Sequence, residues 1–190
     1  MGHNPDTMHG VQMMMKLEIV NLVATGDLKQ QVDLLKLSKL RNVDFDKNIY
    51  GGKVAYLKTE NMFGKVSIFS SGKLISVGSK SYGEAKADLE NSVDILVKNG
   101  LIKPINIDVK LRNIVALLQE PYQIDLEILS NSEQVIYEPE QFPGAILKQN
   151  DPKVTYLIFA SGKIIISGAK SIEDLHVAAN NVREISKKYS

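Results

Sequence analysis

The segment IFSSGKLISVGSKS at residues 68–81 returns as IFASGKIIISGAKS at residues 158–171, with nine of fourteen positions identical. A second pair, VNLVA at 20–24 and RNIVA at 112–116, has an offset of ninety-two residues. A third and weaker pair sets Tyr50-Gly51-Gly52 against Phe142-Pro143-Gly144. Because the first pair has an offset of ninety, we expect two extra residues in the first copy, around residues 59–61. Such self-similarity indicates one structural unit written twice.

The bulk composition fits a globular chain of two fused halves. Halves of about ninety residues seldom bury a sufficient core alone, so we expect 16–103 and 104–190 to share one sheet. Residues 1–15 are interpreted as a flexible leader or a remnant of expression. The absence of cysteine excludes disulfides and thiolate metal sites. No apolar run approaches the roughly 18 residues of a membrane span, and the formal net charge of +1 gives no basic footprint.

Each copy is predicted to read strand, helix, four strands, helix. In the first copy we expect helices at 29–40 and 81–99 and strands at 17–24, 43–45, 53–58, 65–69 and 73–77. In the second copy we expect helices at 123–132 and 171–188 and strands near 106–117, 134–137, 144–148, 153–159 and 163–167. Consecutive strands with short turns favour an antiparallel sheet with the helices segregated to one face.

Residues 164–166 are three isoleucines, so this strand is apolar on both faces. One interpretation is a strand buried on both sides. The other starts from the small number of helices, since two per copy cover one face of the sheet and leave little for the other. A second apolar face without protein cover marks a binding surface.

The blocks YEPEQFPG at 137–144, IFASGKIIISGAKS and IFSSGKLISVGSKS, with the paired Asn-(Leu/Ile)-Val, closely resemble the TATA-box-binding protein core. The resemblance covers roughly residues 16–190. It implies an α+β saddle, in which two tandem pseudo-symmetric repeats form a curved ten-stranded antiparallel sheet with four helices on the convex face. The concave face would bind the minor groove of TATA-like promoter DNA, without a cofactor or catalysis.

The resemblance also implies roles for individual positions. The aromatic side chains that intercalate between bases match Tyr50, Phe69, Phe142 and Phe159. The side chains that line the minor groove match Asn21, Val23, Ile75, Val77, Asn113, Val115, Ile165 and Ser167. Positions at or near the DNA backbone match Ser71, Lys73, Lys148, Lys153, Ser161 and Lys163. The loop that docks transcription factor B in the family matches Glu138, Glu140 and Gln141.

Elementary chemistry agrees with these roles. In the minor groove A·T pairs present only acceptors, whereas G·C pairs add an amino donor. An apolar floor leaves that donor unpaired, and asparagine amides supply donors for the acceptors. Aromatic wedges open base steps at a cost of a few kcal/mol per step, and flexible TA steps deform most easily. Each residue also has a structural interpretation: core aromatics, strand-ending asparagines, solvated lysines and a solvated acidic turn.

The first copy departs from the family pattern at several places. Tyr50 carries a hydroxyl at a wedge position and lacks the proline of the second copy, and Val77 replaces a groove-facing hydroxyl. Lys58 and Lys65 are expected to compensate for arginines missing near Tyr56 and Phe63. These departures predict DNA binding that is weaker or more sensitive to salt.

The leading hypothesis is a general transcription initiation factor that bends A·T-rich DNA and recruits transcription factor B and RNA polymerase. The alternative is a diverged paralogue with weak DNA binding that acts as a protein-interaction module. A homodimer of the free protein through its exposed underside is a further expectation, which the sequence does not decide. An enzyme is not expected, since His176 has no matched nucleophile or carboxylate motif. The protein would be cytoplasmic if archaeal and nuclear if eukaryotic.

Overall fold

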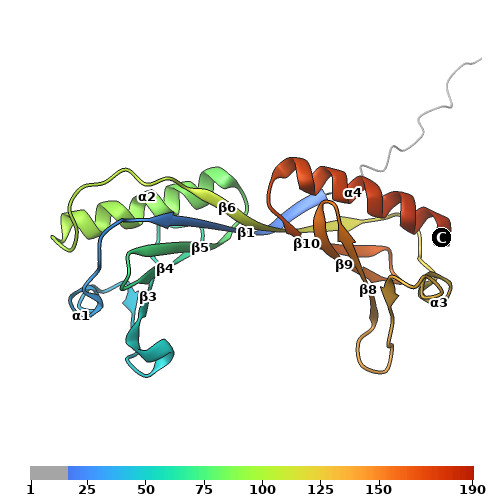
Figure 1. The fold of residues 1–190 in the computed structure, drawn as a ribbon, viewed down its shortest axis with the longest axis horizontal. Helices are drawn as coiled ribbons and strands as arrows, with labels where there is room; N and C mark the ends of the chain where they lie inside the picture. Colours follow the sequence, from blue (N-terminus) through green and yellow to red (C-terminus); the bar gives the residue numbers. More distant parts are fainter. Residues whose placement is uncertain (1–16) are drawn as a thin grey trace, which may run out of the picture.

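The computed structural model describes residues 17–190, and the leader expected at 1–15 lies outside them. The chain forms one curved sheet under two long helices (Figure 1). The first half contains β1 (Leu17–Asp27), α1 (Leu34–Leu37), β2 (Val43–Asp44), η1 (Ile49–Gly52), β3 (Val54–Leu57), β4 (Lys65–Phe69), β5 (Lys73–Ser79) and α2 (Tyr82–Lys98). The second half contains β6 (Lys110–Gln119), α3 (Leu126–Leu129), β7 (Val135–Ile136), β8 (Gly144–Asn150), β9 (Lys153–Phe159), β10 (Lys163–Ala169), α4 (Ile172–Ser186) and η2 (Lys187–Tyr189).

The sheet is antiparallel and runs in the order β2-β3-β4-β5-β1-β6-β10-β9-β8-β7. This order is symmetric about the β1–β6 seam, where Leu22 pairs with Ile114. α2 covers the first half and α4 the second half of one face, and the β2–β3 and β7–β8 loops project from the opposite side (Figure 1). The predicted fold, with its repeat, saddle curvature and ten strands, is confirmed.

The core lies between the sheet and the long helices. Alternate residues of each strand are buried there, such as Leu22 and Ala24 in β1 or Ile164 and Ile166 in β10. Both long helices begin at a serine whose side chain accepts a hydrogen bond from the third residue of the helix, Ser81 from Glu84 N and Ser171 from Asp174 N. Such caps satisfy amide groups that have no partner inside the helix.

The helices predicted at 29–40 and 123–132 are wrong in length, because each forms only four residues. Their N-terminal parts bond to the neighbouring hairpin instead. Leu28 N and Val32 N donate to the carbonyls of Gly72 and Ser70, and Glu120 N and Ile124 N repeat this with Gly162 and Ala160. Backbone groups used in this way are lost to a helix. The other predicted elements are present, with ends that shift by a few residues.

Among the buried polar groups that hold the long helices, two lie at equivalent places, one in each half. Asp88 of α2 accepts hydrogen bonds from Phe63 N, Gly64 N and Ser79 Oγ at 2.9, 2.6 and 3.1 Å. In the second half the Tyr156 hydroxyl of β9 lies 3.1 Å from the carbonyl of Ala178 in α4 and 2.6 Å from Gln149 Oε1. The halves thus solve the same packing problem with different chemistry.

Strand pairing fixes the place of the two extra residues of the first copy. Val54 pairs with Phe69 and Gly144 with Phe159, so the offset of ninety already holds at β3. The offset is still ninety-two at β2 and β7, where Val43 and Val135 pair with Leu57 and Leu147. The insertion therefore lies between β2 and β3, and the expected place at 59–61 is wrong. We call residues 45–53 the first stirrup and residues 137–143 the second stirrup.

Candidate nucleic-acid interface

α2 and α4 leave the opposite face of the sheet, which we call the underside, without a covering helix (Figure 1). Ile164 and Ile166 are fully buried, whereas Ile165 between them is only partly buried. The interpretation of this strand as buried on both sides is therefore wrong. The four aliphatic residues predicted for the groove floor share this partial exposure on neighbouring central strands: Val23, Ile75, Val115 and Ile165.

Asn21 and Asn113 lie at the centre of the underside, where Asn21 pairs with Val115 and Val23 with Asn113. Asn21 Oδ1 accepts a hydrogen bond from Gly78 N at 2.9 Å, and Asn113 Oδ1 accepts one from Gly168 N at 2.9 Å. Both glycines have positive φ, 101° and 108°. These bonds use the amide oxygens, so the NH₂ groups, which have no hydrogen bond within residues 17–190, remain as donors.

The second stirrup ends in a pair of aromatic rings. Phe142 and Phe159 pack edge to face with centroids 5.8 Å apart. Gly144 between them has no side chain, and an added Cβ would lie 2.9 Å from Phe142 Cε1 and 3.1 Å from Phe159 Cε1. The fold therefore brings together the two rings predicted as wedges, and the missing side chain of Gly144 leaves space for both.

The first half does not build a matching pair. Tyr50 is 73% exposed and has a φ of 48°, in the left-handed region that is strained for a side chain of this size. Within the described residues Phe142–Phe159 is the one ring pair, so Tyr50 and Phe69 do not form one. Counting back from β3, Gly52 holds the place that Phe142 holds before β8. The predicted Tyr50–Phe69 pair is thus not assembled in this structure.

The remaining predicted positions flank these features. Six are exposed at the hairpin turns and strand ends: Ser71, Lys73, Lys148, Lys153, Ser161 and Lys163. Val77 is 39% exposed at the place where the second half has Ser167, whose hydroxyl lies 3.5 Å from the carbonyl of Thr155. Exposed Glu138, Glu140 and Gln141 form the turn of the second stirrup, in which Glu138 O accepts from Gln141 N and Phe142 N.

The expected compensation by Lys58 is wrong. Its ammonium group donates to the carbonyls of Met62, Phe63 and Gly64 at 2.6, 2.9 and 2.8 Å, which uses all three of its N–H groups in its own loop. Lys65 lies over the ring of Tyr56, with Nζ 4.7 Å from the ring centroid. Lys58 therefore stabilises the β3–β4 connection, and the positive charge of the first half must come from elsewhere.

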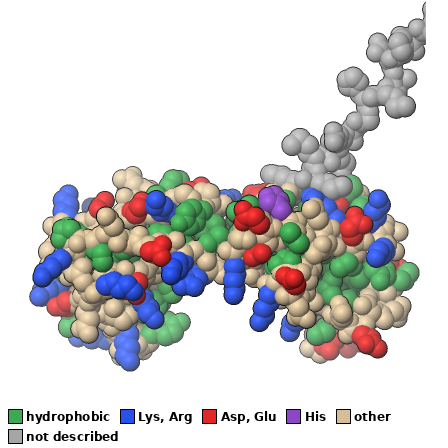
Figure 2. Space-filling view, turned by 45° about the horizontal axis from the view of Figure 1, so that its top comes forward, with side chains coloured by type: hydrophobic (Ala, Val, Ile, Leu, Met, Phe, Trp, Pro, Cys, Tyr) green, Lys and Arg blue, Asp and Glu red, His purple; other side chains and the backbone are tan. Residues whose placement is uncertain are grey.

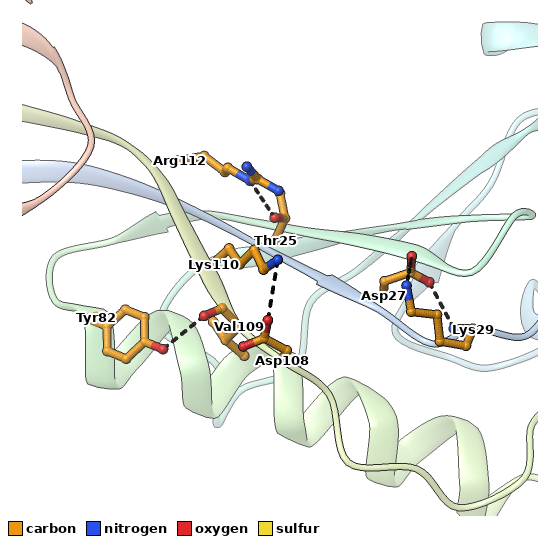
Figure 3. Close-up of polar contacts among 8 residues, drawn as sticks. All are labelled: Thr25, Asp27, Lys29, Tyr82, Asp108, Val109, Lys110 and Arg112. Carbon is orange, nitrogen blue, oxygen red and sulfur yellow. Dashed lines mark hydrogen bonds and ion pairs between the residues drawn. The ribbon is translucent and has the colours of Figure 1, made fainter. Parts of the chain in front are cut away.

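A pocket of about 540 Å³ supplies that charge beside Phe69 and Ile75. Its lining includes four cations: Lys29, Lys73, Lys110 and Arg112. Arg112 Nε donates to Thr25 Oγ1 at 2.9 Å, and Lys110 Nζ lies 3.5 Å from Asp108 Oδ2 (Figure 3). Sequence reasoning missed Lys29, Lys110 and Arg112. The signal was the run Lys110-Leu111-Arg112 before Asn113, where the first copy has Glu18-Ile19-Val20 before Asn21.

An ion pair with Lys29 holds Asp27 at the edge of this pocket. Asp27 accepts from the backbone and side-chain nitrogens of Lys29 at 2.8 and 3.0 Å (Figure 3). These hydrogen bonds lower the pKa of the Asp27 carboxyl below its usual value. In Figure 2 Lys and Arg side chains gather on the first half, whereas acidic side chains lie at the lower tip of the second half.

Residues 17–190 show neither a metal-binding cluster nor a membrane-spanning helix. No group of three or more His, Asp or Glu side chains is arranged to hold a metal ion in this part of the chain. Among the same residues no helix has the length and apolar character needed to cross a membrane.

Known proteins resemble this chain in family, sequence and structure. The family model described as "Transcription factor TFIID (or TATA-binding protein, TBP)" matches residues 16–99 and again residues 108–189. The TATA-box-binding protein of Cenarchaeum symbiosum is 39% identical over 158 residues, which cover 83% of this chain and 86% of that protein. That of Methanothermobacter thermautotrophicus is 36% identical over 169 residues, 88% of this chain and 92% of the relative.

The solved structure of Methanococcus jannaschii TBP superposes with a TM-score of 0.83 at 30% identity, and the match covers 91% of this chain and 99% of that one. The family is one of transcription factors and not of enzymes. The twofold match of the family model follows the two copies in the sequence, and the solved structure shares the fold. This chain belongs to the TATA-box-binding protein family.

Proposed function

We propose that this chain is a general transcription initiation factor that binds and bends A·T-rich promoter DNA through the minor groove. The observation that carries the proposal is the pair of asparagines at the centre of the underside. Gly78 N and Gly168 N fix their amide oxygens, so both NH₂ groups are available as donors. A·T pairs present only acceptors in the minor groove, which such donors complement.

The aliphatic residues around the asparagines support the same preference. Val23 and Val115 lie opposite the asparagines across the seam, and Ile75 and Ile165 lie on the next strands outward. None of these side chains accepts a hydrogen bond, so the amino donor of a G·C pair would be desolvated without a partner. An unpaired buried donor costs about 1–3 kcal/mol. The underside therefore favours A·T pairs by penalising the alternative.

Bending follows from the rings and from the curvature of the sheet. A straight duplex touches a curved surface over a short length, whereas a bent duplex contacts more of it. Phe142 and Phe159 form a preassembled, partly buried pair at one end, and apolar wedges of this kind kink DNA toward the major groove. Unstacking costs a few kcal/mol per step and is offset by the additional contact.

Recruitment of transcription factor B and RNA polymerase is the further part of the proposal. Exposed Glu138, Glu140 and Gln141 belong to the second stirrup, which projects from the sheet (Figure 1). A charged, exposed loop beside the DNA offers a surface to a basic partner. The relatives named above are archaeal, which supports action on the chromosome of an archaeal cytoplasm.

The test measures affinity and bending together. A duplex with an A·T-rich site and donor and acceptor dyes at its ends is titrated with protein, with a G·C-substituted duplex of equal length as the control. We expect binding and a FRET increase with the A·T-rich duplex and much weaker binding to the control. Equal affinity for both duplexes would contradict the proposal. Adding transcription factor B should slow dissociation for the wild type more than for a Glu138→Arg/Glu140→Arg variant.

The exposed Tyr50 and the missing first ring pair favour a second candidate, a diverged family member that acts as a protein-interaction module. Such a protein would bind transcription factor B without bending DNA, and a Phe142→Ala/Phe159→Ala variant would keep that affinity. The bare underside of the free protein could then pair with a second copy, which sedimentation at rising concentration would detect.

A further inference from the structure

We propose that the two halves of this protein hold DNA by different means, so that the duplex is kinked mainly at the end bound by the second half. The second half opens a base step with its ring pair. The first half grips the phosphate backbone with the cationic pocket and opens its step little. The inference rests on the proposed function and adds which end of the site is deformed.

The wedges differ although the strands beneath them match. Phe69 and Phe159 occupy the same position in β4 and β9, each opposite the first residue of the preceding strand. In the second half that residue is Gly144, and Phe142 packs on Phe159. In the first half it is buried Val54, and Gly52 replaces the second ring. Phe69 therefore has no ring to support it when it meets a base step.

The first stirrup also gives the exposed ring of Tyr50 less support than the second stirrup gives Phe142. It is two residues longer than the second stirrup, and Gly51 and Gly52 both have positive φ, 62° and 69°. An added Cβ on Gly51 would meet no atom within 4 Å, which describes an open tip. Tyr50 precedes these glycines and is 73% exposed. A wedge must keep its ring in place while bases separate, and this stirrup supplies no packing for that.

The pocket beside Phe69 has the opposite character, because its walls are tied down. The Gln30 side chain bonds the segment before β6 in both directions, from Nε2 to Lys103 O at 3.0 Å and from Lys103 N to Oε1 at 2.8 Å. The Tyr82 hydroxyl donates to Val109 O at 3.1 Å (Figure 3). Gly26 leaves room for Ile107, since an added Cβ would lie 2.9 Å from its Cδ1.

The charge of the pocket suits phosphate. Four cations face two carboxylates, Asp27 and Asp108, which pair with Lys29 and Lys110 at 3.0 and 3.5 Å. Arg112 contacts only the neutral Thr25 hydroxyl, and Lys73 has no ion pair within residues 17–190. The pocket thus holds two more cations than carboxylates before DNA arrives, although Lys73 lies opposite Asp27 in the β1–β5 pairing. A guanidinium also offers two parallel donors to a phosphate.

The corresponding positions of the second half lack this charge. Thr25 pairs with Lys110 at one end of the seam, and the equivalent residues Leu117 and Glu18 pair at the other end. Glu18 of β1 is therefore the counterpart of Lys110 of β6. By the same register Val20 replaces Arg112, and Gln119 and Pro121 replace Asp27 and Lys29. Only Lys73 has a cationic counterpart, Lys163. Within residues 17–190, the half with the ring pair therefore lacks the cations that line the pocket of the other half.

The bending test compares Phe69→Ala with Phe159→Ala, a matched pair at one register position. On the A·T-rich FRET duplex we expect Phe159→Ala to lose most of the bend and Phe69→Ala to lose several-fold less. Tyr50→Ala should bend DNA like the wild type. Urea unfolding of all variants identifies any loss caused by instability. Equal losses of bend for Phe69→Ala and Phe159→Ala would overturn the asymmetry.

The phosphate test measures the salt dependence of affinity. Each neutralised phosphate contributes about −0.9 to the slope of log K against log salt. A Lys73→Gln/Arg112→Gln variant should therefore reduce the slope by about 2, whereas Lys98→Gln/Lys86→Gln on α2 should leave it unchanged. An unchanged slope for the pocket variant would contradict the phosphate grip.

The two proposals fail in distinguishable ways. If the wild type does not prefer the A·T-rich duplex, the proposed function itself is wrong. If it prefers and bends that duplex but the matched variants behave alike, only the asymmetry is wrong.

Discussion

At the scale of single residues, the central asparagines show how a fold prepares donors for a ligand. Each amide has one acceptor and one donor group, and the bulge glycines Gly78 and Gly168 take the acceptor with their backbone N–H groups. The orientation of the amide is therefore set before any DNA binds. The sequence identified Asn21 and Asn113 through their repetition, but only the hydrogen bonds from Gly78 N and Gly168 N decide which amide atom is left as a free donor on the underside.

An Asn113→Asp substitution tests this arrangement. The carboxylate can still accept the hydrogen bond from Gly168 N, so we expect the folded structure to persist. It replaces the NH₂ donor with a negative charge facing base acceptors and phosphates. We expect the affinity for A·T-rich DNA to fall by about 10-fold to 100-fold, since a good base contact contributes about 1–3 kcal/mol. Fluorescence anisotropy measures the affinity.

The control for this substitution is the free-energy change of unfolding in urea. If Asn113→Asp unfolds at much lower urea than the wild type, the loss of binding reports on stability and not on the amide donor. Asn99→Asp at the C-terminal cap of α2, far from the underside, should leave DNA affinity unchanged.

At the scale of elements, the long helices are attached to the sheet by different side chains at equivalent places. Asp88 in α2 and Ala178 in α4 are ninety residues apart, and in the second half the polar group comes from Tyr156 in β9 instead. Tyr156 is fully buried. Burial raises the pKa of its hydroxyl well above the ordinary value of 10.0.

This raised pKa predicts a loss of stability in alkali. A tyrosine in the unfolded chain ionises near pH 10, whereas folded Tyr156 keeps its proton there. The contribution is therefore fully present below about pH 10 and is lost as the pH rises toward the folded pKa. We expect the loss in the free energy of unfolding to reach about 1 kcal/mol by pH 11. Urea unfolding at several pH values from 8 to 11 measures it.

Tyr156→Phe removes the ionisable group, so its stability should fall less steeply with rising pH than that of the wild type. It should also be less stable at neutral pH, because the hydroxyl bonds to Gln149 and Ala178 are lost. Tyr50→Phe, at an exposed position, should follow the wild-type pH profile. Parallel profiles for the wild type and Tyr156→Phe would contradict the assignment.

At the scale of the whole molecule, the two halves share one sheet through the β1–β6 seam. In the described sheet this pairing joins the two halves across the pseudo-symmetry axis, and it runs from Leu17–Leu118 to Thr25–Lys110. Separating the halves would expose the backbone groups of both strands and the apolar residues beneath them. We therefore expect the halves to unfold together as one cooperative unit.

The chain contains no tryptophan, so one probe can be placed in each half. Phe45→Trp and Tyr137→Trp occupy equivalent, partly buried positions at the bases of the two stirrups. We expect the urea midpoints reported by the two single-Trp variants to coincide with each other and with circular dichroism. Two separate midpoints would mean that each half folds on its own.

The sequence by itself determined the repeat, the order of strands and helices, and the identity of the central asparagines, the aliphatic floor and the phenylalanines of the second half. Repetition made the asparagines, the aliphatic floor and Phe159 visible, since two copies that keep the same residues constrain each other. Phe142 has no phenylalanine counterpart in the first copy and was placed by the family resemblance. Local signals also sufficed for α2 and α4, because their serine caps and apolar periodicity act within a few residues.

Only the tertiary structure decided where the copies cease to match. Strand pairing moved the insertion from residues 59–61 into the first stirrup, which leaves Gly52 where a second ring would be needed. Hairpin hydrogen bonds shortened the helices predicted at 29–40 and 123–132. The cationic pocket joins residues 25–29, 69–75 and 105–112, and segments so distant in the chain meet only when the sheet forms. Local sequence cannot encode such contacts, because their energies depend on the register of strands from both halves.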